Sequence, residues 1–133
     1  MSAAPEVCPC GTGRAYADCC RPLHQNREQA PTAEMLMRSR YSAYARGEVD
    51  HVFRTWHPRT RPPDVTHDPT TTWVGLDVLD VVDGGAGDAT GEVEFAASYV
   101  GPDGRGVLHE RSRFERRAGR WVYVDGRVGP PAG

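Results

Sequence analysis

Apolar and polar side chains alternate along the second half of the chain, which is the pattern of half-buried β-strands. One run spans residues 73–82, a second spans 91–100, and two more lie within 107–125 on either side of a turn at Gly119. Segments rich in glycine, or containing proline, separate these runs. Four successive strands joined by tight turns predict an antiparallel meander.

A helical period precedes the strands. Apolar residues recur three and four positions apart between Thr32, an expected N-cap, and Gly47, an expected C-terminal stop. A second helix is expected from about Glu48 to the His-Pro pair at 57–58, and the short connection predicts an αα-hairpin. Because helices precede strands, the chain should adopt an α+β fold, with helices covering one face of a curved antiparallel sheet of four strands or more. The segment 59–72 should be a surface loop.

The hairpin expected within 107–125 carries an acidic residue on an otherwise apolar face. If its turn centres on 117–119, Phe114 lies opposite Val122 and Arg111 lies opposite Asp125. The side chains then expected to face the helices are Leu108, Glu110, Phe114, Val122 and Val124. The other face would carry His109, Trp121, Tyr123 and Asp125, and we expect it to serve as a homodimer surface.

Arg40 falls inside the apolar stripe of the first predicted helix. In one interpretation its stem packs against the core while its guanidinium reaches water. In the other it is a partly buried cation that needs a carboxylate partner, and Glu110 is the candidate for that role.

A pocket between the helices and the sheet is where we expect any acid–base or ligand-binding chemistry. Its candidate residues are Arg40, Tyr41, Tyr44, Trp56, His57, His109 and Glu110. No catalytic role is assigned to any of them, because the sequence contains no hydrolase or transferase motif. A lone histidine is more often structural or solvated than catalytic.

All four cysteines lie within thirteen residues, as Cys8, Cys10, Cys19 and Cys20. In a secreted protein they would form two disulfides, but no export signal precedes them and a bridge between adjacent cysteines is strained. The alternative is a tetrahedral zinc site with four thiolate ligands. The glycines of 11–13 would turn the chain tightly, and their amides would donate hydrogen bonds to the sulfurs. We therefore predict a structural zinc ion that orders this segment.

A length of 133 residues indicates one domain with a small appendage. The segment after Pro22 is polar, so we divide the chain into a zinc knuckle with its linker, 1–28, and an α+β domain, 29–133. The net charge of −2 disfavours bulk attraction to nucleic acid or anionic lipid. Without an apolar run of about 18 residues or an export signal, we expect no membrane span and a cytoplasmic protein.

The cysteine segment, Cys-Pro-Cys-Gly-Thr-Gly-Arg followed by a Cys-Cys pair, resembles the SEC-C zinc motif, which is named for the C-terminal tail of the SecA translocation motor. The resemblance covers about residues 7–21, with Thr12 in place of the usual serine and Arg14 in place of the usual lysine. By analogy, such motifs bind protein partners or act as small adapters.

Further segments resemble, in order, those of the YchJ family of small bacterial proteins. They are 36–41 (Leu-Met-Arg-Ser-Arg-Tyr), 55–58 (Thr-Trp-His-Pro), 73–76 (Trp-Val-Gly-Leu), 110–114 (Glu-Arg-Ser-Arg-Phe) and 119–126 (Gly-Arg-Trp-Val-Tyr-Val-Asp-Gly). The resemblance implies a nuclear-transport-factor-2-like, cystatin-like cone of helices wrapped by a curved sheet. Family members often carry a second zinc motif at the C-terminus. The sequence ends at 129–133 without one, so we expect no function that needs two zinc modules.

Three functions are consistent with these features. The first is a non-enzymatic binding or adapter protein, in which the knuckle docks an unknown protein partner or locks the N-terminus onto the domain. A closed site of four thiolates supports it, since no coordination position is left for catalysis. The second is an enzyme resembling isomerases, dehydratases or hydrolases, with Glu110 as an acid–base group and Arg40 as an anion clamp. Whether the chain is an enzyme stays open, with the balance against it.

The third function is nucleic-acid or ribosome binding through Arg14, Arg21 and Arg27 near the knuckle. We rank it last, because Tyr16 is the only aromatic residue in the knuckle and the net charge is acidic.

Overall fold

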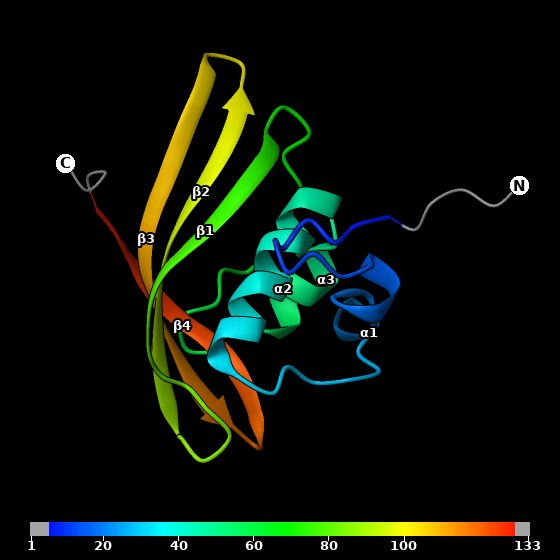
Figure 1. Ribbon diagram of the computed structural model, residues 1–133. Coiled ribbons are helices and arrows are strands. Elements are labelled where there is room, and N and C mark those ends of the chain that lie inside the picture. Colours follow the sequence, from blue (N-terminus) through cyan, green and yellow to red (C-terminus); the bar gives the residue numbers. More distant parts are fainter. Residues whose placement is uncertain (1–5, 130–133) are drawn as a thin grey trace, which may run out of the picture.

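The computed structural model describes residues 6–129. The elements are η1 (Tyr16–Asp18), α1 (Arg21–His24), α2 (Ala33–Arg46), α3 (Val49–Arg54), β1 (Thr72–Asp83), β2 (Thr90–Gly101), β3 (Gly104–Arg117) and β4 (Arg120–Val128). The strands form one antiparallel sheet in the order β1-β2-β3-β4. The sheet curves around the helices, which cover one of its faces (Figure 1). The α+β meander expected from the sequence is confirmed.

Two expectations concern residues at the ends of the chain. One concerns an export signal at residues 1–5, and the other concerns a second zinc motif at residues 130–133. Both stretches lie outside the described residues. Within residues 6–129, every helix is too short or too polar to cross a membrane.

Helix α2 begins and ends where the sequence indicates. The side chain of Thr32 accepts a hydrogen bond of 3.1 Å from the amide of Met35 and caps the first turn. The amide of Gly47 donates to the carbonyl of Ala43 and closes the last turn. The apolar stripe of α2 packs against the sheet. The main core consists of Ala33, Leu36 and Met37 from α2 and of Val93, Phe114 and Trp121 from the strands.

Helix α3 is shorter than expected and ends before Trp56. The next residues leave the helix and pair with the edge strand β4: the amide of Tyr123 donates to the carbonyl of Thr55 at 2.7 Å, and the amide of His57 donates to the carbonyl of Tyr123 at 2.8 Å. Edge strands expose unpaired backbone groups. The segment after α3 satisfies those of β4, which explains why the helical period of the sequence is overridden there.

The turn between β3 and β4 consists of Ala118 and Gly119, whose φ angles are 51° and 80°. Two positive φ angles in a two-residue loop match the right-handed twist of a hairpin. The loop pairs Arg117 with Arg120, and a bulge interrupts the ladder between Arg113 and Phe114. On the side of the bulge away from the turn, the pairing of β3 with β4 is offset by one further residue.

The expected register of this hairpin is therefore wrong. Phe114 lies opposite Tyr123, and Arg113 lies opposite Asp125 and forms an ion pair of 2.7 Å with it. The partners expected from the sequence had been Val122 for Phe114 and Arg111 for Asp125.

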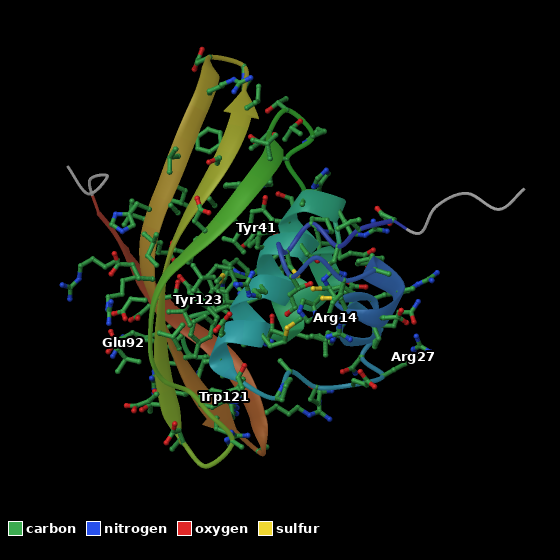
Figure 2. All side chains as sticks on the ribbon, viewed as in Figure 1. Arg14, Arg27, Tyr41, Glu92, Trp121 and Tyr123 are labelled. Atoms are coloured by element: carbon green, nitrogen blue, oxygen red, sulfur yellow. The ribbon has the colours of Figure 1, made fainter. Side chains whose placement is uncertain are left out.

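The shift also changes which aromatic side chains of β4 meet the helices. Trp121 belongs to the main core and Tyr123 packs against that core, so the expectation that they form a homodimer surface on the outer face is wrong. The outer face instead carries charged groups: Arg111 forms ion pairs with Asp80, Glu92 and Glu94. In Figure 2, Glu92 lies on the side of the sheet away from the helices, and Trp121 lies on the helix side.

The segment 6–24 packs on the helical layer, on the side away from the sheet (Figure 1). Leu23 and His24, which the sequence had suggested were part of a polar linker, lie in α1 and are buried. The hydroxyl of Tyr16 is 2.7 Å from Nδ1 of His24, and Nε2 of His24 is 2.9 Å from the carbonyl oxygen of Ser39 in α2. Because a carbonyl only accepts, Nε2 carries the proton and Tyr16 donates to Nδ1.

A second buried histidine, His51 of α3, continues this polar chain. The hydroxyl of Ser39 donates to the carbonyl of Leu36 at 2.7 Å, so Nε2 of His51 donates to that hydroxyl at 2.9 Å. Burial, together with the nearby His24, Arg40 and Arg54, lowers the pKa of His51 to about 3. His51 is therefore neutral in the folded protein.

We expect acid to destabilise the protein in part through His51. Its folded pKa of about 3 lies below the value of about 6.5 in an unfolded chain, so between these values only the unfolded chain takes up the proton. The free energy of unfolding should therefore fall as the pH drops below about 6.5, by about 2 kcal/mol at pH 5 from this one group. Thermal unfolding of the wild type and of His51→Gln across this pH range measures the effect.

Glutamine at position 51 can still donate to Ser39 but cannot be protonated, so the variant should lose less stability on acidification than the wild type. Protonation of the cysteine segment affects both proteins alike and does not enter the difference. Parallel stability profiles for the two proteins would show that His51 has no such role.

Candidate functional site

The cysteine segment folds back on itself as a small hairpin. The amide of Cys8 donates to the carbonyl of Arg14 at 2.8 Å, and the amide of Tyr16 donates to the carbonyl of Glu6 at 2.8 Å. The 3-10 turn η1 and the start of α1 then bring Cys19 and Cys20 beside the first pair of cysteines. The cysteine sulfurs and Tyr16 form a second buried cluster against Met35 of α2.

The four Sγ atoms lie within 4.8 Å of one another, and all four side chains are buried. None forms a disulfide, and the Sγ atoms of Cys10 and Cys19 are 3.5 Å apart. A tetrahedral ion with metal–sulfur bonds of about 2.3 Å, the length for zinc, would place its ligands about 3.8 Å apart. The four cysteines, Cys8, Cys10, Cys19 and Cys20, therefore fit a tetrahedral metal ion, and their soft sulfur donors suit a thiophilic one.

The polar support for these sulfurs comes from Thr12. Its hydroxyl lies 3.5 Å from Sγ of Cys10 and 3.2 Å from Sγ of Cys19. The expectation that glycine amides would donate to the sulfurs is not met within the described residues. Hydrogen bonds from Cys20 and Cys8 lower the pKa of Cys10, whereas burial raises the pKa of Cys19 to about 11. Four buried thiolates would repel one another, so a cation is needed to deprotonate the whole set.

Helix α2 holds the cysteine hairpin in place. Arg38 donates from Nη1 to the carbonyl of Cys10 at 2.7 Å, and its Nε forms an ion pair of 2.9 Å with Glu34 one turn earlier. The guanidinium of Arg46 lies over the ring of Tyr16, 3.7 Å from its centroid. The hairpin is thus packed against α2 by side chains that α2 itself supplies.

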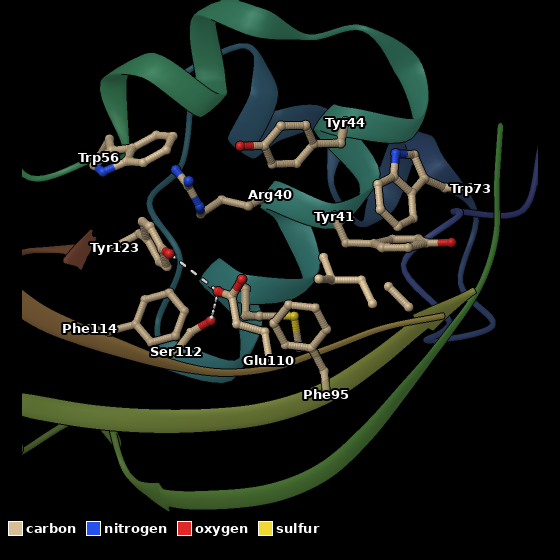
Figure 3. Close-up of a pocket in the computed structure, with 13 residues that line it drawn as sticks. Arg40, Tyr41, Tyr44, Trp56, Trp73, Phe95, Glu110, Ser112, Phe114 and Tyr123 are labelled. Atoms are coloured by element: carbon tan, nitrogen blue, oxygen red, sulfur yellow. Dashed lines mark hydrogen bonds between the residues drawn. The ribbon is translucent and has the colours of Figure 1, made fainter. Parts of the chain in front are cut away.

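A cavity of about 280 Å³ lies between α2 and the sheet (Figure 3). It is lined by Met37, Arg40, Tyr41, Tyr44, Trp56, Trp73, Phe95, Ala97, Leu108, Glu110, Ser112, Phe114 and Tyr123. Figure 3 shows Arg40, Glu110 and Ser112 gathered near Tyr123 at one end, while Tyr41, Trp73 and Phe95 lie together at the other. The pocket therefore has a polar end and an apolar end.

Glu110 is held at the polar end by two hydroxyl groups. Its Oε2 accepts from Ser112 at 2.6 Å and from Tyr123 at 3.2 Å. Burial and the nearby Glu110 carboxylate both raise the pKa of Tyr123, so its phenol stays protonated and donates. The carboxylate lies where a Cβ on Gly126 would be, so only glycine at that position leaves room for it.

Arg40 is 6% exposed, and its guanidinium lies 5.0 Å from the ring centroid of Trp56 and 4.5 Å from that of Tyr123. Its Nη1 donates to the carbonyl of Val52 at 2.9 Å and to the hydroxyl of Thr55 at 2.8 Å. Both interpretations from the sequence need correction: the head lies inside, beside two aromatic rings, instead of extending into bulk solvent, and it forms no ion pair with Glu110. Burial lowers the pKa of Arg40, but an arginine pKa is so high that the group stays charged.

The structure brings together five of the seven pocket candidates and separates the other two. Arg40, Tyr41, Tyr44, Trp56 and Glu110 line the cavity. His57 and His109 do not, contrary to expectation. The side chain of His57 accepts from the amide of Arg59 at 3.0 Å, because its backbone is paired with the edge of β4. His109 contacts Glu94 at 2.7 Å on the outer face, because neighbours on a strand point to opposite faces.

Several residues of the site were not recognised from the sequence. Tyr123 was assigned to the wrong face, and Trp73 and Phe95 appeared only as strand residues. The alternation in 91–100 could have placed Phe95 on the inner face, but it carries no information on which inner residues border an empty space. His24 was missed because it lies in a segment that is polar by composition.

The arginines near the knuckle lie on the exterior. Arg14, Arg21 and Arg27 are all exposed. Arg14 donates to the carbonyl of Asp18, and Figure 2 shows Arg27 at the periphery of the protein. Tyr16 is buried beneath Arg46, so it is not available to stack on a base. Proteins that bind unpaired nucleotides combine contacts to the phosphates with stacking of the bases on exposed aromatic rings, and the second contribution is missing from the part of the knuckle that the structure describes.

Comparison with known proteins agrees with this architecture. A family model described as "YchJ, middle NTF2-like domain" matches residues 32–126, and the SEC-C motif matches residues 5–22. A UPF0225 protein of Streptomyces coelicolor is 54% identical over 119 residues, which is 90% of this chain and 93% of that protein. A UPF0225 protein of Deinococcus radiodurans is 50% identical over 89% of this chain and 86% of its own.

Two solved structures share the whole fold. The solution structure of a SEC-C motif containing protein from Rhodopseudomonas palustris has a TM-score of 0.80 and 34% identity, and covers 96% of this chain and 100% of that one. The crystal structure of a SEC-C motif containing protein from Psychrobacter arcticus has a TM-score of 0.75 and 28% identity, over 96% of this chain and 85% of that one. On the combined evidence of motif, fold and relatives, the chain belongs to the YchJ family of UPF0225 proteins, with an N-terminal SEC-C motif and a nuclear-transport-factor-2-like domain.

Proposed function

We propose that this protein is a non-enzymatic binding protein, in which a four-cysteine zinc site is structural and the pocket beneath α2 takes a small ligand. The two sites have separate roles. The zinc site joins the N-terminal segment to the helical layer, and the pocket carries recognition.

The structural role of the metal is supported by the donor set and by its surroundings. Zinc sites with four protein ligands are closed, whereas catalytic ones keep a position for water or substrate. The cysteine hairpin has little core of its own, and its contacts run to α2 through Arg38 and Met35. Metal binding by a segment of this size contributes directly to its folding.

The cavity of about 280 Å³ is the observation that carries the binding proposal. Protein cores are close-packed, so a space of this size between a helix and a sheet is not a packing defect of the ordinary kind. Small-molecule sites are concave and mostly apolar, with few polar groups that set orientation. The aromatic wall and the polar end with Arg40 and Glu110 fit this description.

Acid–base catalysis is the second candidate, favoured by one observation. Within the described residues, Oε1 of Glu110 has no hydrogen-bond donor while it borders the cavity. A catalyst would convert the bound molecule, and Glu110→Gln would stop the conversion. A binding protein would release its ligand unchanged. Mass spectrometry of the recovered ligand distinguishes the two functions.

We expect the purified protein to contain one zinc ion per chain, measurable by elemental analysis. Cys19→Ser should lose the metal and lower the thermal midpoint by about 10 °C, since about 3 kcal/mol of stability would go with the anchored segment. Asp18→Asn is a matched control, because Asp18 is exposed in the same turn and offers no sulfur. It should retain both metal and midpoint. Wild-type protein without stoichiometric metal, or Cys19→Ser with an unchanged midpoint, would refute the structural zinc site.

A further inference from the structure

We infer that the pocket binds a small monocarboxylate with a flat apolar body, whose carboxylate is gripped by the free edge of the Arg40 guanidinium. This inference rests on the proposed function, because it names the class of ligand that the pocket takes.

The Arg40 guanidinium has one part committed to the fold and one part that is free. Both bonds of Nη1 hold the end of α3, at Val52 and Thr55. The rings of Trp56 and Tyr123, whose centroids are 5.1 Å apart, lie together beside the guanidinium, 5.0 and 4.5 Å from its Cζ. Within residues 6–129, Nε and Nη2 have no hydrogen-bond acceptor. These two groups form one edge with parallel N–H bonds, which is the geometry that matches the two oxygens of a carboxylate.

A buried cation without an ion-pair partner is costly, and the two hydrogen bonds of Nη1 and the two neighbouring rings offset only part of that cost. Glu110 is the acidic group at the same end of the pocket, yet its Oε2 is engaged by Ser112 and Tyr123 instead of by Arg40. The space for Glu110 is provided by Gly126. The fold therefore holds the carboxylate and the guanidinium apart, with the cavity between α2 and the sheet open to both.

The apolar end of the pocket determines the shape of the ligand's hydrocarbon part. The ring of Tyr41 meets that of Trp73 edge-on at 6.1 Å, and Trp73 in turn meets Tyr99 at 5.4 Å, so this wall is a fixed aromatic surface. Phe95 and Leu108 complete it. A flat ring or a short unsaturated chain covers such a wall with little loss of conformational freedom.

The volume of the cavity and the charges at its polar end restrict the class of ligand further. An engineered cavity of about 150 Å³ takes benzene. The volume here, about 280 Å³, therefore suits a ring with a short carboxylate arm. A phosphate dianion would place excess negative charge next to Glu110, and an amine would leave the free edge of Arg40 without an acceptor. A monocarboxylate satisfies the edge with the least repulsion.

The test compares trans-cinnamate with its neutral isostere cinnamamide, each added to the zinc-loaded full chain. Binding is measured by calorimetry and by the fluorescence of Trp56 and Trp73, which line the pocket. We expect the acid to bind about thirtyfold more tightly than the amide, because only the acid offers two anionic oxygens to the guanidinium edge.

Three variants assign the effect to the pocket. Arg40→Lys keeps the charge and a donor for α3 but loses the paired edge, so it should weaken cinnamate about tenfold and leave cinnamamide unchanged. Glu110→Gln removes a nearby negative charge, so cinnamate binding should stay the same or tighten. Arg127→Gln is the control, because Arg127 is exposed near the end of β4 and does not line the pocket. This variant should bind both cinnamate and cinnamamide with the affinity of the wild type.

The outcomes separate this inference from the proposed function. If acid and amide bind equally well and both perturb the tryptophans, the carboxylate inference is wrong and the binding function stands. If neither probe binds, both are wrong. Loss of cinnamate binding in Glu110→Gln would place the ligand's polar group at Glu110 and overturn the role of Arg40. Should Arg40→Lys fail to fold, Leu108→Trp, which fills the apolar end, must abolish cinnamate binding for the inference to survive.

Discussion

Helix α2 is covered on two sides, and the rest of the structure depends on how it satisfies both neighbours. Toward the sheet it presents Leu36 and Met37, which join the main core. Toward the N-terminal segment it presents Arg38, which donates to the carbonyl of Cys10, and the carbonyl of Ser39, which accepts from His24 of α1. A helix covered on two sides must pair the polar groups that it buries there. The polar chain through His24 and His51 meets this requirement on the side where α1 and α3 pack against α2.

This arrangement explains how a hairpin of so few residues can be part of a stable protein. Its own buried cluster consists of sulfur atoms and one ring, Tyr16, so hydrophobic burial within it is small. A metal ion held by the four cysteines would supply the missing cohesion, and α2 supplies the surface on which the hairpin rests. The two contributions are coupled, because the Tyr16–His24 bond begins in the hairpin and ends in the buried face of the helices.

The pocket arises from the opposite side of the same helix. The sheet curves, so its strands are close to α2 at Trp121 and Val93 and leave a space near Arg40. The aromatic residues around that space have partners among themselves, including the Phe114–Tyr123 pair at 5.8 Å. Arg40 connects the two functions of α2, since it holds the end of α3 with one nitrogen and presents its remaining edge at the pocket.

By itself, the sequence determined the order of elements, the bounds of α2 and the cysteine cluster, because these depend on local period, capping residues and spacing. It did not determine the faces of β4. That depended on a bulge between Arg113 and Phe114 and on a two-residue turn containing Ala118, neither of which changes the alternation that a reader of the sequence sees. The fate of Arg40 was likewise decided by tertiary structure. A guanidinium can reach water, pair with a carboxylate or lie beside aromatic rings, and which of these occurs depends on groups that are distant in the chain and that only folding brings near.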